Sequence, residues 1–396
     1  IAAAQWGIGL AAIGWFGMMF SEKKIKGSLG IMTLPTIAYI VICLITSAFA
    51  ERTGHSLASV WDNEWLLFSA VIIVAVKPDR AELRRIILLL LAAGIVSAFL
   101  GLGEHFTGLR YKAENQKIFL AYKIGNLQTY RPILFFGHTL SYAYDMGMLF
   151  FIATGLLIAK CDLKKNFLRL AVIFIGLAVV VAFSRGTWYA AIVTGAGLYF
   201  IVPETKIRKT ILTTLAVILL GGILIPQFHQ RVTIEESGDN ASSDREVYWG
   251  IALKIWQDHP IMGIGADNWD LFYPRYKPAS TTALLSNPDH PHNEYLNVLT
   301  SFGAFGLAAY LWMWAALLWV ALKALKREHD PLYRGILIGG MGALICVLIA
   351  QVTQDIFHDF TNQLMWWFIT GLMLVVIDRD GEQGEQKMTI ESSEKS

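Results

Sequence analysis

The heptapeptide HPHNEYL at residues 290–296 marks the point where a long polar segment meets an apolar helix. The residues before it, back to about position 226, are typical of a water-exposed loop, and those after it are typical of a membrane span. We expect Asn293 and Glu294 to lie in the first turn of that helix, with His292 against its partly positive end. This position favours anions and disfavours a protonated imidazole, so His292 is expected to stay neutral and able to accept a proton.

The composition indicates a membrane protein. Of the 396 residues, 55% are hydrophobic and 16% are charged, and the mean hydropathy is positive, which is too apolar for a soluble domain of this size. The net charge of +2 gives no indication of a basic face for nucleic acid. We therefore predict an all-α polytopic membrane protein with about 11–12 transmembrane helices.

Apolar runs of about the length that crosses a bilayer recur along the chain. The first begins at Ile1 without a preceding Met or basic region, so we expect it to be a truncated span, with one further span before it. The runs cover residues 1–20, 28–50, 65–76, 86–103, 132–159, 170–183, 187–202, 210–225, 295–322, 335–354 and 362–377.

Lysine and arginine concentrate in every second connection between these runs, which the positive-inside rule predicts to be cytoplasmic. These basic connections are 21–27, 77–85, 160–169, 203–209 and 323–334. The alternate connections then face outward, and they are 51–64, 104–131, 184–186, 226–294 and 355–361. All histidines except His329 lie in the outward connections or, as His138 does, near the outer end of a span, so any histidine chemistry is expected outside.

This topology predicts four regions along the chain. They are N-terminal transmembrane helices (1–225), a large outer loop region containing helices (226–294), C-terminal transmembrane helices (295–377) and a disordered cytoplasmic tail (378–396).

The outer loop region is long enough to fold by itself. Residues 242–256 have the pattern of a capped amphipathic helix, and a turn-rich run follows at 263–269. We predict that Trp269 and the nearby aromatic side chains form a patch at the membrane interface. The other members of this patch are Phe272, Tyr273 and Tyr276.

Two arginines have an environment that suits an anionic ligand. Arg185 lies where two apolar runs join almost without a loop, and an unpaired arginine at that depth is costly. It is expected to bind a phosphate or, alternatively, to reach lipid headgroups. Arg245 opens the loop helix, where the alternative is a solvated arginine paired with Asp244 or Glu246.

His292 also has other interpretations. It could simply orient the helix that follows, or it could bind zinc together with His290 and Asp289, although no third strong ligand has a recognisable spacing. Asp145 lies within an apolar run and keeps a proton-coupled transporter open as a hypothesis. Its alternative role is a hydrogen bond to Tyr142, Tyr144 or another helix.

From about residue 180 to 320 the chain resembles the membrane glycosyltransferases that use polyprenyl-pyrophosphate-linked glycans: O-antigen ligases, O-antigen polymerases and bacterial protein O-oligosaccharyltransferases. The resemblance rests on the order of short motifs around the large outer loop. They are SRG at 184–186, Arg245, HPIMGIG at 259–265, HNEYL at 292–296 and SFG at 301–303.

The resemblance implies a GT-C-like helix bundle with its active site on the periplasmic side of the bacterial inner membrane. It implies that His292 is the general base and that Arg185 and Arg245 bind the lipid pyrophosphate. A glycan on pyrophosphate already has a good leaving group, so a base and these cations could suffice without a cofactor or a metal, with inversion of the anomeric centre. Further supporting candidates are His290, Asn293, Tyr248, His138 and Arg131.

Within this superfamily we favour an O-antigen ligase. The expected substrates are an undecaprenyl-pyrophosphate-linked glycan and a lipid A-core acceptor, with membrane lipids around the protein and no nucleic acid. The outer connection 104–131 is shorter than the second large loop that the polymerases often carry, and the chain ends in a short tail rather than in a further outer domain. A polymerase, a protein O-oligosaccharyltransferase and a membrane transporter remain the alternatives.

Overall fold

The protein is built almost entirely from helices. The computed structural model describes residues 29–109, 120–124, 127–201, 241–278, 288–356 and 359–393. Within these ranges, seven helical segments are long and apolar enough to cross a membrane, so the prediction of an all-α polytopic membrane protein is confirmed. The spans predicted at 1–20 and 210–225 lie outside the described residues, as do the basic connections at 21–27 and 203–209. The seven segments are 30–48, 53–76, 80–107, 139–158, 294–327, 331–350 and 360–379.

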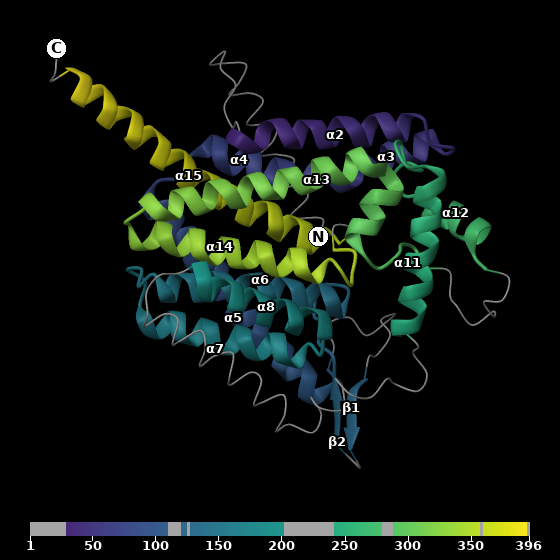
Figure 1. The fold of residues 1–396 in the computed structure, drawn as a ribbon. Helices are drawn as coiled ribbons and strands as arrows, with labels where there is room; N and C mark the ends of the chain where they lie inside the picture. The colour runs from purple at the N-terminus through teal and green to yellow at the C-terminus, as the bar shows by residue number, and fades with distance from the viewer. Residues whose placement is uncertain are drawn as a thin grey trace. The chain divides into compact units, whose positions relative to one another are not determined.

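The order of elements is shown in Figure 1. The elements are η1 (Gly30–Met32), α2 (Thr33–Ala48), α3 (Thr53–Glu64), η2 (Trp65–Leu67), α4 (Phe68–Val76), α5 (Arg80–Thr107), β1 (Leu120–Ile124), β2 (Leu127–Tyr130), α6 (Thr139–Ile158), α7 (Lys165–Val181), α8 (Arg185–Ile201), α11 (Ala241–Asp258), α12 (Trp269–Tyr276), α13 (Glu294–Arg327), α14 (Pro331–Ala350) and α15 (Phe360–Ser393).

Several helix boundaries differ from the prediction. Residues 53–64, expected in an outward connection, form α3 and belong to the candidate span 53–76, and α5 begins at Arg80, six residues before the predicted run. The span expected from residue 132 begins as α6 at Thr139, because Leu134 and Gly137 have positive φ angles that interrupt a helix. Helix α15 continues past Ile377 to Ser393 and so includes most of the predicted disordered tail. Three Glu and two Gln residues in this extension have a high intrinsic helix propensity.

The chain forms two compact units that interleave along the sequence. Unit 1 comprises Ile1–Val71, Glu235–Val320 and Gln351–Gln363, and unit 2 comprises Ile72–Ile234, Ala321–Ala350 and Leu364–Ser396.

In unit 2, α6 is almost completely buried and packs most extensively against α14. Figure 1 shows α6, α7, α8 and α14 side by side. The close approach of α6 to α14 depends on glycine, since a Cβ on Gly155 or on Gly339 would meet the backbone of the facing helix. Small residues that allow such contact are typical of helix pairs in membranes.

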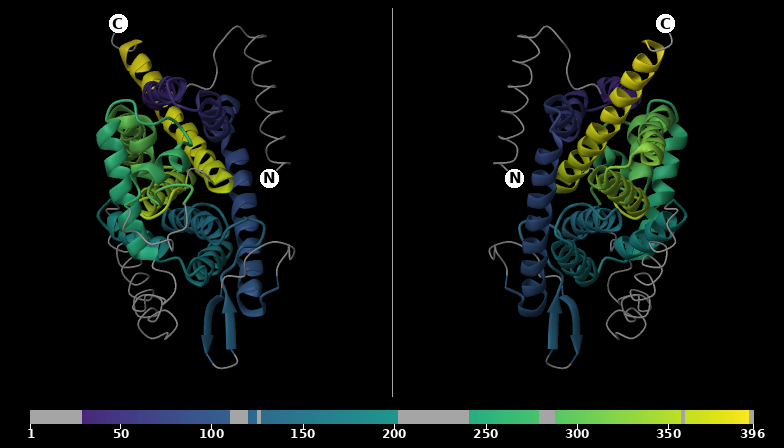
Figure 2. Two further views of the ribbon diagram at one scale, coloured as in Figure 1. Left: turned by 90° about the vertical axis from the view of Figure 1, so that its right-hand side faces the viewer. Right: turned by 90° about the vertical axis from the view of Figure 1, so that its left-hand side faces the viewer.

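A short antiparallel hairpin, β1 and β2, lies next to the end of α5 in unit 2 (Figure 2). The Nδ1 atom of His105, in the last turn of α5, lies 2.6 Å from the carbonyl oxygen of Tyr130 at the end of β2. The carboxylate of Glu104 accepts hydrogen bonds from the backbone N–H groups of Ile133 and Leu134. These bonds fix the segment that leads into α6.

In unit 1, α11 and α12 share a buried apolar cluster. Ile251 and Ile255 of α11 pack with Trp269, Phe272 and Tyr273 of α12, all of which are buried. The prediction that these aromatic residues form a patch at the membrane interface is therefore wrong for Trp269, Phe272 and Tyr273. Their burial against α11 removes more apolar surface from water than an interfacial position would.

Helix α13 contains a sharp bend, visible in Figure 1, at Gly303, whose φ is 69° and ψ is −171°. The bend leaves backbone N–H and C=O groups of α13 without partners in the helix, and the turn-rich run after α11 forms hydrogen bonds with them. Ile264 N–H donates to Thr300 O at 2.9 Å, and Ala304 N–H donates to Pro260 O at 2.9 Å. The HPIMGIG and SFG motifs are thus joined in one backbone arrangement.

Contacts between connections follow the alternation seen in the sequence. In unit 1, the start of α3 and the residue before it, which were expected in the outward connection 51–64, contact α12 and the run leading into it. Arg52 pairs with Asp270 at 2.8 Å, and His55 pairs with Asp267 at 2.9 Å. In unit 2, the basic connections contact each other through Arg80, which binds Asp162 at 3.0 Å and Asp330 at 2.7 Å. Within each unit, connections assigned to the same side therefore meet.

Candidate functional site

The site in unit 1 is built on the first turn of α13. Helix α13 begins at Glu294, and the side chain of Asn293 caps it by accepting a hydrogen bond from Leu296 N–H at 3.1 Å. His292 precedes this cap and has a φ of 53°, a left-handed conformation that is uncommon outside glycine. The predicted start of this helix is confirmed, and the turn before it directs the His292 side chain into the protein.

The two histidines of the HPHNEYL stretch contact each other. His292 N–H donates to Nδ1 of His290 at 3.1 Å, and the centroids of the two rings are 4.4 Å apart in an edge-to-face arrangement. The same Nδ1 of His290 lies 3.9 Å from Oδ2 of Asp355. His290 therefore orients the backbone of His292 and lies next to a buried carboxylate.

The imidazole of His292 is held in its neutral form. Burial lowers its pKa to about 4, and the nearby positive charges of His290 and Arg245 act in the same direction. A hydrogen bond to the Gln354 side chain and the charge of Asp355 oppose this shift without cancelling it. The sequence-based expectation of a neutral His292 agrees with this direction, although burial and not the helix end is the main cause.

The ring nitrogens of His292 have different surroundings. Nδ1 is buried and has no hydrogen-bond partner among the described residues. Since Nδ1 has no such partner, we assign the interaction with the Gln354 side chain, which acts on the pKa of His292, to Nε2. A neutral ring that donates its single N–H to Gln354 carries its lone pair on Nδ1, the nitrogen available to accept a proton.

The connection between α14 and α15 supports this site, and the sequence analysis assigned it no such role. Asn297 Nδ2 donates to the buried Asp355 at 2.9 Å, and Ile356 N–H donates to Glu294 at 3.2 Å. The N–H of Glu294 in turn donates to Gln351 O at 2.9 Å. The sequence contains one signal for this supporting role. The polar residues Gln354 and Asp355 closely follow an apolar run, where unpaired polar groups are costly.

Helix α11 adds two of the predicted residues. Tyr248 is buried, and its ring centroid is 5.9 Å from that of His292. Arg245 lies one turn earlier, is partly buried, and is near enough for its charge to lower the pKa of His292. Five predicted residues, His290, His292, Asn293, Arg245 and Tyr248, therefore meet in unit 1.

The other three predicted residues, Arg185, Arg131 and His138, belong to unit 2. Arg185 is the first residue of α8, which Ser184 caps by accepting from Thr187 N–H at 3.3 Å. Arg131 donates from Nε to Ala182 O at 3.2 Å, in the turn that precedes Arg185. Arg131 is thus hydrogen-bonded to the turn that precedes Arg185.

His138 has a structural role. It is the N-cap residue of α6, and its Nδ1 accepts from Leu140 N–H at 3.1 Å. Asp145, the basis of the transporter hypothesis, is buried in the same helix.

The zinc alternative gains no geometric support. Among the described residues, which include Asp289, His290 and His292, no group of three or more histidine, cysteine, aspartate or glutamate side chains is arranged to hold a metal ion.

Comparisons with known proteins agree with the resemblance noted in the sequence. Residues 170–311 match the O-antigen ligase family, Wzy_C. The chain is 22% identical to the teichuronic acid biosynthesis protein TuaE of Bacillus subtilis (strain 168) over 238 residues. The aligned segment covers 57% of this chain. The aligned part spans 45% of that relative. The segment that matches the O-antigen ligase family contains Arg185, Arg245 and His292.

Proposed function

We propose that the protein transfers a glycan from a polyprenyl-pyrophosphate lipid to an acceptor hydroxyl, as an O-antigen ligase at the outer face of the bacterial inner membrane. The observation that carries this proposal is the partly buried, neutral His292 beside the cation Arg245, with an Nδ1 that has no hydrogen-bond partner among the described residues. A general base and a phosphate-binding cation are the two groups that such a transfer needs. The match to the O-antigen ligase family supports the same reaction class.

In the proposed reaction, Nδ1 of His292 removes the proton from the acceptor hydroxyl as its oxygen attacks the anomeric carbon. The bond from that carbon to the pyrophosphate oxygen breaks, and the electron pair leaves with the pyrophosphate. The negative charge that develops there is stabilised by Arg245 and Arg185, whose planar guanidinium groups bind phosphate oxygens in pairs. Attack from the side opposite the leaving group inverts the anomeric centre.

A base with a pKa near 4 is a weak base in the free enzyme, so the substrate must strengthen it. A pyrophosphate near Arg245 would offset one of the two positive charges that lower the pKa of His292. Substrate binding would thereby raise this pKa toward neutrality, which places the base nearer to its best operating range. The proposal thus links donor binding to activation of the base.

The test is transfer of an undecaprenyl-pyrophosphate-linked glycan onto lipid A-core by the detergent-solubilised protein in EDTA. Transfer by the wild type, loss of transfer in His292→Ala and an inverted product linkage by NMR are the expected results. His55→Ala is the matched control, because His55 is an exposed histidine of the same unit that pairs with Asp267. A retained linkage or full activity of His292→Ala would refute the assignment of His292.

The relative in teichuronic acid biosynthesis favours a second candidate within the same chemistry, the assembly of a different lipid-linked glycan. Replacing lipid A-core with a second copy of the donor lipid in the same assay separates a polymerase from a ligase. Replacing it with an acceptor protein tests the protein O-oligosaccharyltransferase. A transporter would give none of these products and would move the intact donor lipid across vesicles.

A further inference from the structure

A small polar cavity lies within unit 1, beside the part of α13 that precedes the bend at Gly303. Its volume is about 30 Å³, whereas roughly 10–15 Å³ is enough to hold one water molecule. Residues of α2, α3, the run before α12 and α13 line it. The polar residues among them are Tyr39, Asn63, Glu64, Glu294, Asn297 and Ser301.

Two carboxylates line this cavity. Glu64 of α3 and Glu294 of α13 are both close enough to Tyr39 of α2 for their charges to act on its hydroxyl group. Glu294 is only 2% exposed, so bulk water screens its charge little. Among the described residues that line the cavity, none is a lysine, an arginine or a histidine. Two carboxylates in such a place repel each other, which favours a proton or a metal cation between them.

The other oxygen atoms of the lining favour a metal cation over a shared proton. Ser301 is 7% exposed, and its hydroxyl group has no hydrogen-bond partner among the described residues. The side-chain N–H of Asn297 donates to Asp355 at 2.9 Å, and that of Asn63 donates to Ser59 Oγ at 3.3 Å. The amide oxygens of both asparagines are therefore left to accept. A shared proton binds two oxygen atoms, whereas a cation can use these further oxygens as ligands.

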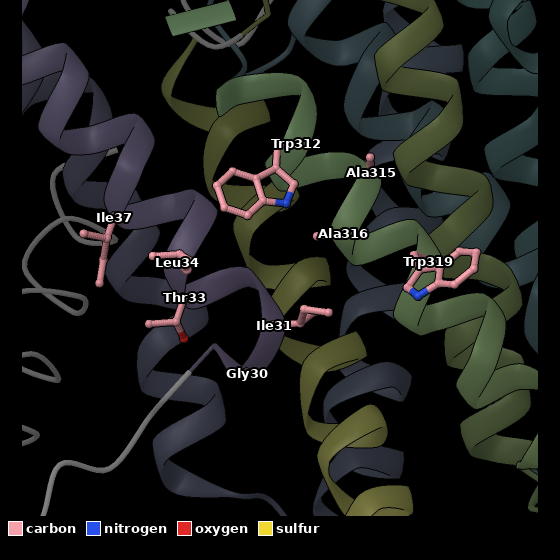
Figure 3. Close-up of a pocket in the computed structure, with 9 residues that line it drawn as sticks. All are labelled: Gly30, Ile31, Thr33, Leu34, Ile37, Trp312, Ala315, Ala316 and Trp319. Carbon is pink, nitrogen blue, oxygen red and sulfur yellow. The ribbon is translucent and has the colours of Figure 1, made fainter. Parts of the chain in front are cut away.

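The bend in α13 is a further feature that favours a cation. The first part of α13 ends just beyond Ser301, and the C-terminal end of a helix carries a partial negative charge. In transporters, interrupted membrane helices bind sodium ions near such ends. The groove between α2 and α13 in Figure 3 has a different chemistry, because Thr33 supplies the only side-chain oxygen among its described lining residues. The polar cavity is therefore the candidate for an ion.

We propose that the cavity binds a single sodium ion through the side-chain oxygens of Glu64, Glu294, Asn297 and Ser301. Oxygen ligands suit hard cations such as sodium. A divalent ion is disfavoured, since no three or more histidine, cysteine, aspartate or glutamate side chains are grouped to hold a metal within the described part of the chain. The small volume suits sodium better than the larger potassium ion.

The ion would also support the position of His292. Glu294 accepts a hydrogen bond from Ile356 N–H, and Asn297 binds Asp355. An ion that fixes these two side chains of α13 would hold the connection that carries Gln354, the partner of the His292 ring. Ion binding itself does not depend on the proposed function, but its effect on glycan transfer does.

The experiment measures equilibrium binding of radiolabelled sodium ions to the full chain in detergent, in choline chloride with EDTA. The wild type should bind a single ion per chain. Glu64→Gln keeps the shape and removes a charged ligand, so it should weaken binding by about tenfold or more. Asp62→Asn is the matched control and should bind as the wild type does, because Asp62 is an exposed carboxylate of the same helix that does not line the cavity.

Two further measurements keep the proposal testable if Glu64→Gln does not fold. Ser301→Ala removes a neutral ligand and should weaken sodium binding severalfold. At equal ionic strength, sodium chloride should raise the unfolding temperature of the wild type above that in choline chloride, and it should do so less for Ser301→Ala. A thiol-reactive dye reports this temperature, because the three cysteines of the chain are buried and unpaired.

A folded wild type that binds no sodium would overturn the proposal and leave water or a shared proton as the occupant. Equal sodium binding by the wild type, Glu64→Gln and Ser301→Ala would also overturn it, since the ion would then lie elsewhere. Glycan transfer distinguishes these results from failure of the proposed function. Sodium binding without transfer in either salt would refute the proposed function alone, and transfer without sodium binding would refute the ion site alone.

Discussion

Substitution of Gly303 by alanine tests the structural account of the bent α13. The φ of 69° and ψ of −171° at this position lie in a region that is essentially restricted to glycine. A Cβ there would also meet the backbone carbonyl of Ile261. The backbone strain costs about 2 kcal/mol. Relieving the clash requires the run 260–265 to shift, which breaks at least one of its backbone hydrogen bonds to α13, worth about 1 kcal/mol.

Gly303→Ala is therefore expected to lower the free energy of unfolding by about 3 kcal/mol. Cysteine accessibility provides the assay, because Cys43, Cys161 and Cys346 are all buried and unpaired. A thiol-reactive dye should label them at a lower temperature in the variant, in detergent, than in the wild type.

Gly250→Ala is the matched control for this substitution. Gly250 lies within α11, and a Cβ on it would meet nothing within 4 Å. Alanine should raise helix stability there by up to about 1 kcal/mol. If Gly303→Ala and Gly250→Ala unfold at the same temperature, the bend and its hydrogen bonds do not contribute to stability as argued.

Three further predictions concern charge and packing. Because burial holds the pKa of His292 at about 4, kcat/KM for glycan transfer should fall only as pH drops toward 4, and Arg245→Gln should move this fall to higher pH, as measured in a pH–rate profile. Gly339→Val should separate α14 from α6 and lower the yield of folded, monodisperse protein in size-exclusion chromatography, because the added side chain has no space. Arg275→Glu should leave the unfolding temperature almost unchanged even though Arg275 binds Glu51 at 2.7 Å, since water screens this exposed pair; a large loss that Glu51→Arg restores would contradict this.

The parts of the site that the sequence could predict are those specified by local chemistry. Asn293 and Ser184 are good N-cap residues just before apolar runs, and they cap α13 and α8. The loop helix predicted for residues 242–256 is α11. Each of these features depends on residues a few positions apart, which a single sequence displays directly.

The support of His292 by Gln354 and Asp355 depends on residues that are far apart in the chain. A single sequence contains no signal for the pairing of Asp355 with Asn297, because the geometry that joins them comes from the packing of three helices. The left-handed backbone of His292 has the same origin, since histidine does not prefer that conformation locally. The main cause of the low pKa, burial, was for this reason not predictable.

The aromatic residues of α12 show how one pattern fits two environments. Trp269, Phe272 and Tyr273 follow the spacing of one helix face, and aromatic side chains suit both a membrane interface and a protein core. The three side chains lie in a protein core because Ile251 and Ile255 of α11 provide an apolar face against which they pack.

This packing has a consequence for the proposed chemistry. The ring of Tyr273 lies 5.9 Å from that of Tyr248, and Tyr248 is in turn 5.9 Å from His292. The aromatic side chains of α12 therefore hold the face of α11 that carries Tyr248 against the site, and Arg245 lies one turn away on the same helix. Residues predicted to form an aromatic patch at the membrane interface instead position the groups that we propose to act on the substrate, so their loss should affect transfer more than membrane insertion.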